Sequence, residues 1–382
     1  MKRNLKRAIA AAITLISLQA TVFTANAVTE YTPCNDVSVV RNPILYKESS
    51  DILGKYSFSV NLAQKDGKTY FYDMKRNIFC GLSMSNIDST DSTNYYHENN
   101  ALLYNVGKAW DFYNDLGWDF YGRNEPISIT RSVNNKSGGV NNAGASNYGL
   151  VFGIGDGIRT QDWGTDIDIV THEYTHLVTG LKLGWDSTVK GETACLMEAY
   201  SDIMGELNDD TREWKIGTDH NIENINANNK NFSLRDIKSP KDTETPYYST
   251  NNFYTDYISL REALPTLMNS NSGDRTYSAL GSTVISNAAY LMESYGIPAE
   301  DLKVIWYRSM DKLKDMTDDT KEATFSDCRK AVLASTDVFT ETKKNNYNDN
   351  IKKAFDKVGV YIMGDVNDDG EIDSKDIAYY KS

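Results

Sequence analysis

The residues that most constrain the fold of this chain are His172, Glu173 and His176, which stand in the run His-Glu-Tyr-Thr-His. The apolar spacing around them predicts a helix over residues 168–181. Residues four apart share one face of a helix, so both imidazoles can reach one metal ion, while Glu173 points about 100° away. A zinc hydrolase needs two neutral nitrogen ligands and a carboxylate that can take a proton from water. Two exposed histidines on an amphipathic helix are the alternative interpretation.

A third protein ligand is expected on the next predicted helix, residues 191–208. Glu198 is the candidate for this ligand. Asp202 lies four residues further on the same face, where its carboxylate can accept the second ring N–H of a histidine ligand. Two solvated acids are the alternative interpretation. It is disfavoured by the apolar residues nearby, which are Leu196, Met197, Ile203 and Met204.

The pattern of the chain changes where the first of these helices begins. Residues 28–166 contain alternating stretches, at 55–63 and 68–74, that predict strands, and one predicted helix at 99–118. Residues 167–360 have mainly helical spacing. The further helices predicted there are residues 280–296, 299–313 and 325–339. We therefore expect a β-rich N-terminal half, an α-helical C-terminal half and more than one domain.

The N-terminus resembles an export signal. Four basic residues precede an apolar run at residues 8–18, and Ala25-Asn26-Ala27 has the small-x-small pattern of a signal-peptidase site. Residues 1–27 are therefore predicted to be removed, and the mature protein is predicted to be secreted and extracellular. The run is too short to span a membrane, and no later segment has the roughly 20 apolar residues that a span needs. We expect no membrane partner.

Charge and cysteine content limit the partners further. The chain has 40 basic and 53 acidic residues, a formal net charge of -13, which argues against a nucleic-acid partner because phosphate binding needs a basic surface. Its cysteines are widely spaced and form no Cys-x-x-Cys motif. In an exported protein two disulfides could form, and all three pairings stay open. The cysteines are Cys34, Cys80, Cys195 and Cys328.

The motifs together resemble a known family. His-Glu-Tyr-Thr-His followed by Glu-Ala-Tyr-Ser-Asp is similar to the signature of the thermolysin family of zinc metalloendopeptidases. The resemblance implies a two-lobed α+β fold with a β-rich N-terminal lobe, an α-helical C-terminal lobe and zinc in the cleft between them. It also implies that Asn142 and Ala143, in an edge-strand segment, and Arg235, in Ser-Leu-Arg-Asp, hold the peptide substrate.

The chain departs from the family pattern at the position that stabilises the oxyanion. The resemblance places Ala279 where the family has a histidine, and Val189 or a near neighbour where it has a tyrosine. Losing such a donor lowers turnover, so we expect reduced activity. Tyr277, which lies between Asp274 and Ala279, is the candidate substitute donor, and a packed core tyrosine is the alternative interpretation.

The family's calcium cluster is also expected to be degraded. Asp168, Asp209 and Glu213 fall at acidic positions, but Lys215 and Thr218 stand where further carboxylates are expected. A hard cation that takes six to eight oxygen ligands loses affinity with each such change.

The C-terminal run Gly-Asp-Val-Asn-Asp-Asp-Gly-Glu-Ile-Asp predicts a separate calcium loop. An acidic disordered tail is the alternative interpretation. The run resembles the first calcium loop of a dockerin, which implies that residues 361–382 are a partial dockerin. A cohesin-bearing scaffold would be its partner if a longer chain completed the module. The expected ligands are Asp365, Asn367, Asp369, Glu371, Asp373 and Asp376.

These features predict a secreted zinc metalloendopeptidase that acts on peptide or protein substrates. His172, His176 and Glu198 would bind one catalytic Zn²⁺, and Glu173 would be the general base. The alternative is a zinc-binding pseudopeptidase that serves as a scaffold-attached binding module. Retention of Glu173 favours catalysis, because zinc binding alone does not require it.

Overall fold

The computed structural model describes part of the chain, and the expected leader at residues 1–27 lies outside it. The chain divides into two compact units. Unit 1 is Met1–Val178 with Gly217–Phe232, and unit 2 is Thr179–Ile216 with Ser233–Ser382. The described residues are 32–41, 58–65, 68–73, 78–82, 92–118, 127–132, 141–146, 149–157, 160–218, 233–243, 253–268, 273–362 and 364–365.

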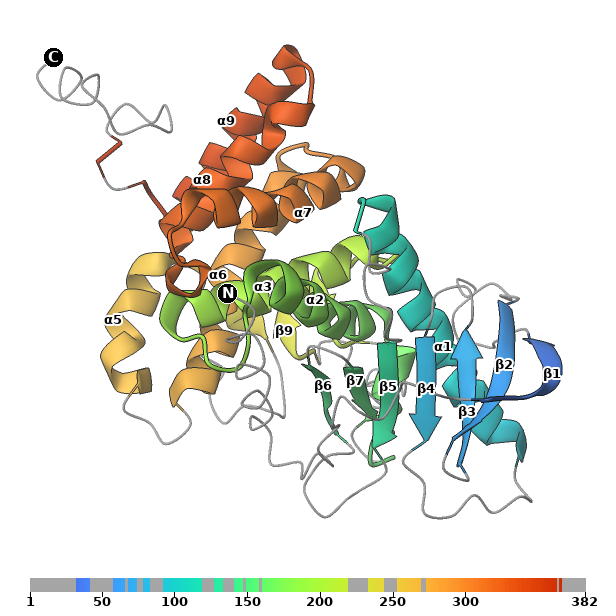
Figure 1. Ribbon diagram of the computed structural model, residues 1–382. Coiled ribbons are helices and arrows are strands. Elements are labelled where there is room, and N and C mark those ends of the chain that lie inside the picture. The colour runs from blue at the N-terminus through green and yellow to red at the C-terminus, as the bar shows by residue number, and fades with distance from the viewer. Residues whose placement is uncertain are drawn as a thin grey trace, which may run out of the picture. The chain divides into compact units, whose positions relative to one another are not determined.

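Unit 1 contains a mixed β-sheet. Its described strands are β1 (Thr32–Arg41), β2 (Phe58–Lys65), β3 (Lys68–Asp73), β4 (Ile78–Leu82), β5 (Ile127–Ser132), β6 (Ala143–Ser146) and β7 (Gly149–Gly153). Their order is β1-β2-β3-β4-β5-β7-β6 (Figure 1). β5 pairs parallel with β4 and β7, and the other neighbouring strands pair antiparallel. β6 is therefore an edge strand among the described strands.

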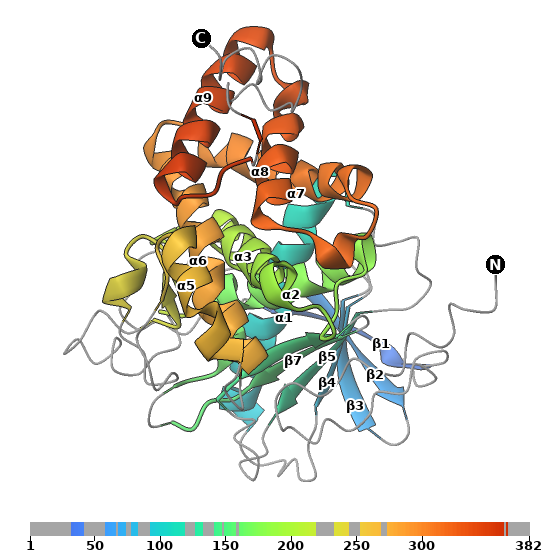
Figure 2. The same ribbon diagram turned by 90° about the vertical axis from the view of Figure 1, so that its left-hand side faces the viewer.

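Apolar side chains at alternate strand positions are buried on one face of this sheet. Ile127 and Ile129 on β5 are fully buried, as is Phe152 on β7, in keeping with the two-residue period of a strand. Helix α1 (Ser92–Asp115) packs against β4 (Figure 2). Its buried side chains recur at helical spacing, so the helix presents an apolar stripe. They include Leu102, Val106, Ala109 and Tyr113.

Helix α2 (Ile167–Leu183) carries both motif histidines. The sequence pattern changes at the start of α2, whereas the division between the units falls inside it, and the segment that begins at Gly217 returns to unit 1. One reason is that the Gly217 N–H donates a hydrogen bond of 3.0 Å to the Asp168 carboxylate at the start of α2.

Unit 2 is mainly helical. Its described elements are α3 (Gly191–Asn208), α5 (Tyr257–Met268), α6 (Gly273–Ser294), α7 (Ala299–Met316), α8 (Phe325–Ala334), α9 (Glu341–Lys357) and two short paired strands, β8 (Lys215–Ile216) and β9 (Arg235–Asp236). Short 3-10 turns join them at Pro240–Asp242, Thr320–Glu322 and Ser335–Val338. α6 packs against α3, α5, α7 and α9 (Figure 2).

Cysteine and surface properties of the described part bear on the sequence expectations. Cys195 and Cys328 carry free, buried thiols, so neither takes part in the disulfides left open above. Burial raises the pKa of Cys328 to about 12.

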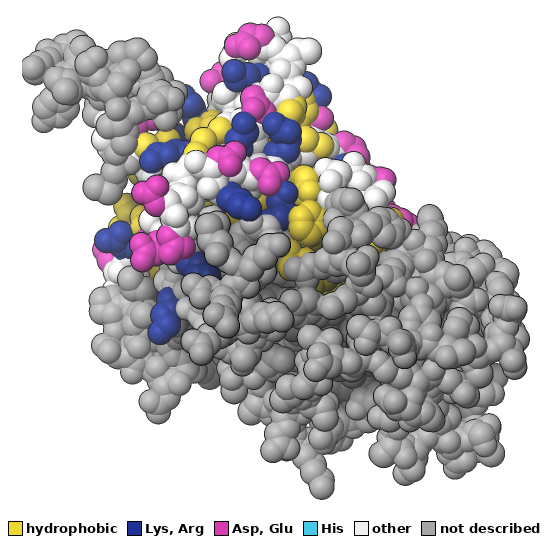
Figure 3. Space-filling model, viewed as in Figure 1, with side chains coloured by type: hydrophobic (Ala, Val, Ile, Leu, Met, Phe, Trp, Pro, Cys, Tyr) yellow, Lys and Arg dark blue, Asp and Glu magenta, His cyan; other side chains and the backbone are white. Residues whose placement is uncertain are grey.

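On the face seen in Figure 3, acidic and basic side chains are interspersed over the described surface. No helix of the described residues has the length and hydropathy to cross a membrane.

Candidate metal centre

The segment that leads into α2 is held by α1. Asp162 caps the 3-10 turn η5 (Trp163–Thr165) by accepting the Gly164 N–H at 2.8 Å. Asn105 of α1 donates from Nδ2 to the Gly164 carbonyl at 3.0 Å. A side chain on Gly164 would place its Cβ 2.7 Å from Leu102 Cδ1, so a larger residue would force the Leu102 side chain to move. The start of α2 is therefore fixed against α1.

A second contact sets the rotation of α2. Thr175 Oγ1 donates to the Thr171 carbonyl at 2.7 Å, so the Tyr113 hydroxyl, also 2.7 Å from Thr175 Oγ1, must be the donor in that pair. The Tyr113 and Tyr174 rings are stacked with centroids 5.5 Å apart. With this side of α2 packed on α1, the orientation of the neighbouring His172 and His176 follows.

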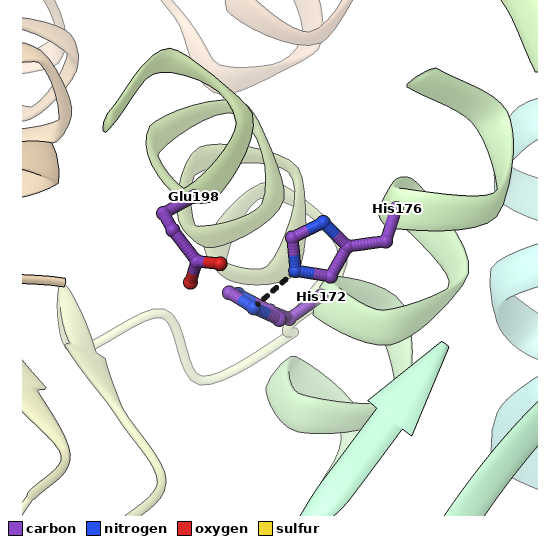
Figure 4. A group of neighbouring side chains, drawn as sticks. All are labelled: His172, His176 and Glu198. Carbon is purple, nitrogen blue, oxygen red and sulfur yellow. Dashed lines mark hydrogen bonds between the residues drawn. The ribbon is translucent and has the colours of Figure 1, made fainter. Parts of the chain in front are cut away.

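The two histidines and Glu198 come together as the sequence predicts. His172 Nε2 lies 3.0 Å from His176 Nε2, and the rings are nearly perpendicular, at 84°. One ligand atom from each histidine and from Glu198 all lie within 4.8 Å of one another. Figure 4 shows both rings projecting from α2 toward the Glu198 carboxylate on α3. His172 and Glu173 are buried, whereas His176 and Glu198 are half-buried.

This donor set fits Zn²⁺. Two imidazole nitrogens and one carboxylate oxygen are ligands that zinc favours, and three protein ligands are typical of catalytic zinc sites. The two nitrogens, 3.0 Å apart, are slightly closer than the roughly 3.3 Å between two corners of a tetrahedron with metal–nitrogen bonds of about 2.0 to 2.1 Å, so a small movement of either ring would admit the ion. No second group of three or more potential ligands was found among the described residues.

Asp202 and Arg235 form a buried ion pair. Arg235 Nε donates to Asp202 Oδ2 and Nη2 donates to Oδ1, each at 2.7 Å. Asp202 is fully buried, and Arg235 is 5% exposed. The sequence assigned these residues separate roles, one toward a histidine and one toward the substrate, and it missed their direct contact. No local signal could have revealed it, because the residues are 33 positions apart.

The residues expected to hold the peptide lie at well-defined positions. Ala143 begins edge strand β6, and the Gly153 N–H of β7 donates to the Asn142 carbonyl at 2.8 Å. Arg235 lies on β9, which the Ile237 N–H extends by donating to the Trp214 carbonyl at 2.8 Å.

The expected substitute donor is deeply buried. Tyr277 on α6 is 0% exposed, and its hydroxyl has no hydrogen-bond partner among the described residues. Burial raises the pKa of the phenol, and the nearby Cys195 and Glu192 raise it further. None of these neighbours is a candidate zinc ligand. Ala279 and Val189, expected at the family's histidine and tyrosine positions, are both 7% exposed.

The expected calcium ligands are not gathered into a site within the described residues. Asp209 Oδ1 accepts from the Thr211 backbone N–H and hydroxyl, Glu213 is exposed, and Lys215 Nζ lies 3.2 Å from Asp236. The only ligand group found in the described part of the chain is the one that contains the two histidines. Of the C-terminal loop, Asp365 is described, and the other expected ligands lie outside the described residues: Asn367, Asp369, Glu371, Asp373 and Asp376.

The chain matches two models of one protein family. Residues 47–180 match the model described as thermolysin metallopeptidase, catalytic domain, and residues 188–360 match thermolysin metallopeptidase, alpha-helical domain. A solved structure described as the precursor of protealysin, a metalloproteinase from Serratia proteamaculans, has the same fold. It is 19% identical with a TM-score of 0.55, and the match covers 76% of this chain and 86% of that chain.

Curated relatives belong to the same group. Neutral protease B of Bacillus subtilis (strain 168) is 27% identical over 270 residues, which are 67% of this chain and 44% of the relative. Thermolysin of Bacillus sp. (strain EA1) is 28% identical over 311 residues, which are 76% of this chain and 51% of the relative. The chain thus spans about half the length of these relatives. Because the two family models together account for most of its residues, the chain belongs to the thermolysin family of metallopeptidases.

Proposed function

We propose that this protein is a secreted, zinc-dependent metalloendopeptidase that hydrolyses peptide bonds in peptides or proteins. The observation that carries the proposal is the gathering of His172, His176 and Glu198 within 4.8 Å, with Glu173 buried beside the first histidine. The names of the curated relatives, neutral protease and thermolysin, point the same way.

Each residue has a defined part in this reaction. His172, His176 and Glu198 would hold zinc, which when bound supplies Lewis-acid polarisation of the attacking water and of the scissile carbonyl. Glu173 takes the proton from that water and delivers it to the leaving amine. Asn142 and Ala143 hold the peptide along the sheet edge, as an added strand is held. Arg235 binds a substrate carbonyl, and Asp202 orients a histidine ligand.

The activity is expected to be low. Ala279 and Val189 offer no hydrogen bond to the developing oxyanion, and the loss of one such donor typically lowers turnover by about 100- to 1000-fold. The same substitutions favour the second candidate function, a zinc-binding pseudopeptidase that acts as a scaffold-attached binding module. Only a measurement of hydrolysis separates the two functions.

Casein digestion tests the proposal. Wild-type protein should cut casein, a chelator should abolish the activity, and added zinc should restore it. Glu173→Gln should retain zinc, measured by atomic absorption, and lose the activity. Glu300→Gln changes an exposed glutamate on α7 in the same way and should behave as wild type. If the turnover of the wild type is no higher than that of Glu173→Gln, the peptidase proposal is contradicted and the pseudopeptidase is supported.

Export and the C-terminal loop complete the proposal. Export rests on the leader pattern of residues 1–27, and N-terminal sequencing of the secreted protein should begin at Val28.

Residues 364–376 would order around Ca²⁺, and cohesin binding would need a longer chain with a second loop. If calcium titrated into a peptide of residues 361–382 does not bind, the proposed calcium loop is contradicted and the proposed peptidase activity is unaffected.

A further inference from the structure

Three polar side chains outside the metal centre form a hydrogen-bonded cluster next to edge strand β6. Asn141 Nδ2 donates to Asp156 Oδ2 at 2.7 Å, and the Thr160 hydroxyl donates to Asn141 Oδ1 at 2.8 Å. The Thr160 backbone N–H donates to Asp156 Oδ1 at 3.3 Å. All three residues lie in unit 1. Thr160 is fully buried, and the other two are half-buried.

The direction of each hydrogen bond in this cluster is determined by its chemistry. The Trp163 indole N–H, 3.3 Å from Thr160 Oγ1, can only donate. The hydroxyl proton of Thr160 is therefore available for Asn141 Oδ1, which leaves the Asn141 amide nitrogen facing Asp156. The carboxylate of Asp156 can only accept when it is ionised, so it meets one side-chain donor and one backbone donor. Every polar atom named has a complementary partner.

The cluster is joined to the segment proposed to hold the substrate. Asn141 directly precedes Asn142, whose carbonyl accepts the Gly153 N–H at 2.8 Å. Asp156 lies in the turn after β7, which folds tightly back on itself. At Gly155, where φ is +77°, a Cβ would lie 2.3 Å from the Thr160 carbonyl oxygen, so only glycine fits.

We infer that Asn141, Asp156 and Thr160 are positioning residues that fix the Asn142–Ala143 segment in the conformation that accepts an extended peptide substrate. This inference rests on the proposed function. β6 is an edge strand among the described strands and pairs with β7, so a peptide can add to it only if the start of β6 keeps its register. The cluster ties Asn141, two residues before that start, to Asp156 and Thr160 after β7. It therefore acts on peptide affinity, and it does not touch the reacting atoms.

An exchange of two side chains tests the inference. Asn141→Asp places two carboxylates at the 2.7 Å contact. Asp156→Asn leaves one acceptor oxygen at position 156, although the Asn141 amide and the Thr160 backbone N–H each donate to a separate oxygen there. The double variant Asn141→Asp/Asp156→Asn restores each bond. The new carboxylate at position 141 would accept from the new amide at position 156 and from the Thr160 hydroxyl. The carbonyl oxygen of that amide would accept the Thr160 backbone N–H.

Fluorescein-labelled casein reports both turnover and binding. Each single variant should raise KM about tenfold with kcat nearly unchanged, because a hydrogen bond to a charged group is worth about that factor, and the double variant should return KM to near the wild-type value. Zinc content should be equal in all of these proteins. Asn114→Asp, which makes the same change at an exposed position on α1, is the control and should leave KM unchanged.

Anisotropy with the same casein, measured in a Glu173→Gln background, separates this inference from the proposed function. Binding that weakens in the single variants and recovers in the double variant supports the cluster even if the wild type hydrolyses nothing. Wild-type KM and affinity in both single variants would overturn the inference. Single variants that fall in kcat, or that do not recover in the double variant, would assign the effect to general damage and overturn it as well. The absence of casein binding by every protein would overturn the cluster and the proposed function together.

Discussion

The Asp202 carboxylate is fully buried and holds the Arg235 guanidinium through two hydrogen bonds of 2.7 Å. Asp202→Ala removes this partner from the Arg235 guanidinium, and Arg235 is only 5% exposed. Removing one member of a buried ion pair typically costs about 3 to 5 kcal/mol, so the free energy of unfolding in urea should fall by about that amount. The double variant Asp202→Leu/Arg235→Met removes both charges and should lose less. An equal or larger loss in the double variant would contradict this account.

Glu206 on α3 predicts a pH dependence of stability. Burial, and then the charge of Asp209, raises the pKa of Glu206 well above its ordinary value of 4.5. A carboxyl whose pKa is raised by folding contributes stability that is fully present below the ordinary pKa and is lost as the pH rises through the folded pKa. Glu206→Gln removes this titration, and its amide oxygen can still accept the Trp214 N–H, now 2.7 Å from Glu206 Oε2.

We therefore expect Glu206→Gln to gain stability relative to the wild type as the pH rises above the ordinary glutamate pKa of 4.5. Urea midpoints over this rise in pH measure the difference, with a calcium chelator present so that no cation can compete for the carboxylate. Glu300→Gln, at a site where the side chain is 80% exposed, should show no such trend. A constant difference between wild type and Glu206→Gln would contradict the raised pKa.

Tyr277→Phe tests the substitute oxyanion donor. The change removes only a hydroxyl that has no hydrogen-bond partner among the described residues. Because an unpaired buried polar group costs about 1 to 3 kcal/mol, Tm should stay the same or rise. If Tyr277 is the donor, turnover on casein should also fall at least about tenfold at equal zinc content. Unchanged turnover would leave Tyr277 as a packed core residue.

At the level of elements, the contact between α3 and α6 depends on Gly281. A Cβ at this position would lie 2.6 Å from Cys195 Sγ and 3.2 Å from Leu260. Gly281→Ala should therefore overpack the contact and lower the free energy of unfolding by about 1 to 3 kcal/mol. Cys195→Ala removes the closest atom, so the double variant should recover part of the loss. Additive effects of the two changes, measured in a double-mutant cycle, would contradict this packing account.

The sequence predicts elements well where the signal is local. The helix predicted at residues 191–208 agrees with α3 (Gly191–Asn208), because its apolar spacing is uninterrupted. The same spacing in α2 brings the two histidines to one face. α5 (Tyr257–Met268) was missed, since Pro265 interrupts its helical pattern. The strands predicted at 55–63 and 68–74 begin or end a few residues from β2 and β3, as expected where turns alone set the ends.

Contacts between distant parts of the chain were beyond the sequence. Asp202 and Arg235 were each singled out by motif, but their pairing depends on how β9 returns to α3. Asn141 and Asp156 carry no motif of their own, and their contact arises because the turn after β7 folds back on itself. The burial of Tyr277 could not be read from its position between Asp274 and Ala279, because it depends on the packing of α6 on α3.

At the scale of the whole molecule, the change from alternating to helical spacing predicted a β-rich half and a helical half, and the resemblance carried by the histidine and glutamate motifs implied the thermolysin-like α+β fold. The family and structure comparisons confirm that fold. Composition contributed little to that prediction beyond excluding other classes. The three expected metal ligands come from two helices, so the metal should affect the stability of the whole molecule, and this effect can be measured.

Removing zinc should lower the stability of the complete protein. A ligand at 100 times its Kd stabilises the native state by about 2.7 kcal/mol, and each kcal/mol shifts Tm by about 2 to 4 °C in domains of about 150 to 250 residues. Chelation should therefore lower Tm by several degrees, as measured by differential scanning calorimetry. His176→Ala removes one ligand, so this variant should have a lower Tm that a chelator hardly changes.

The metal added after chelation decides which site is responsible. Recovery of Tm with zinc alone, in the wild type and not in His176→Ala, would assign the effect to the group of His172, His176 and Glu198. Recovery with calcium alone would instead show that Asp168, Asp209 and Glu213 retain the family's calcium cluster despite Lys215 and Thr218. The first result is expected, because within the described residues Asp209 and Lys215 already have partners in Thr211 and Asp236.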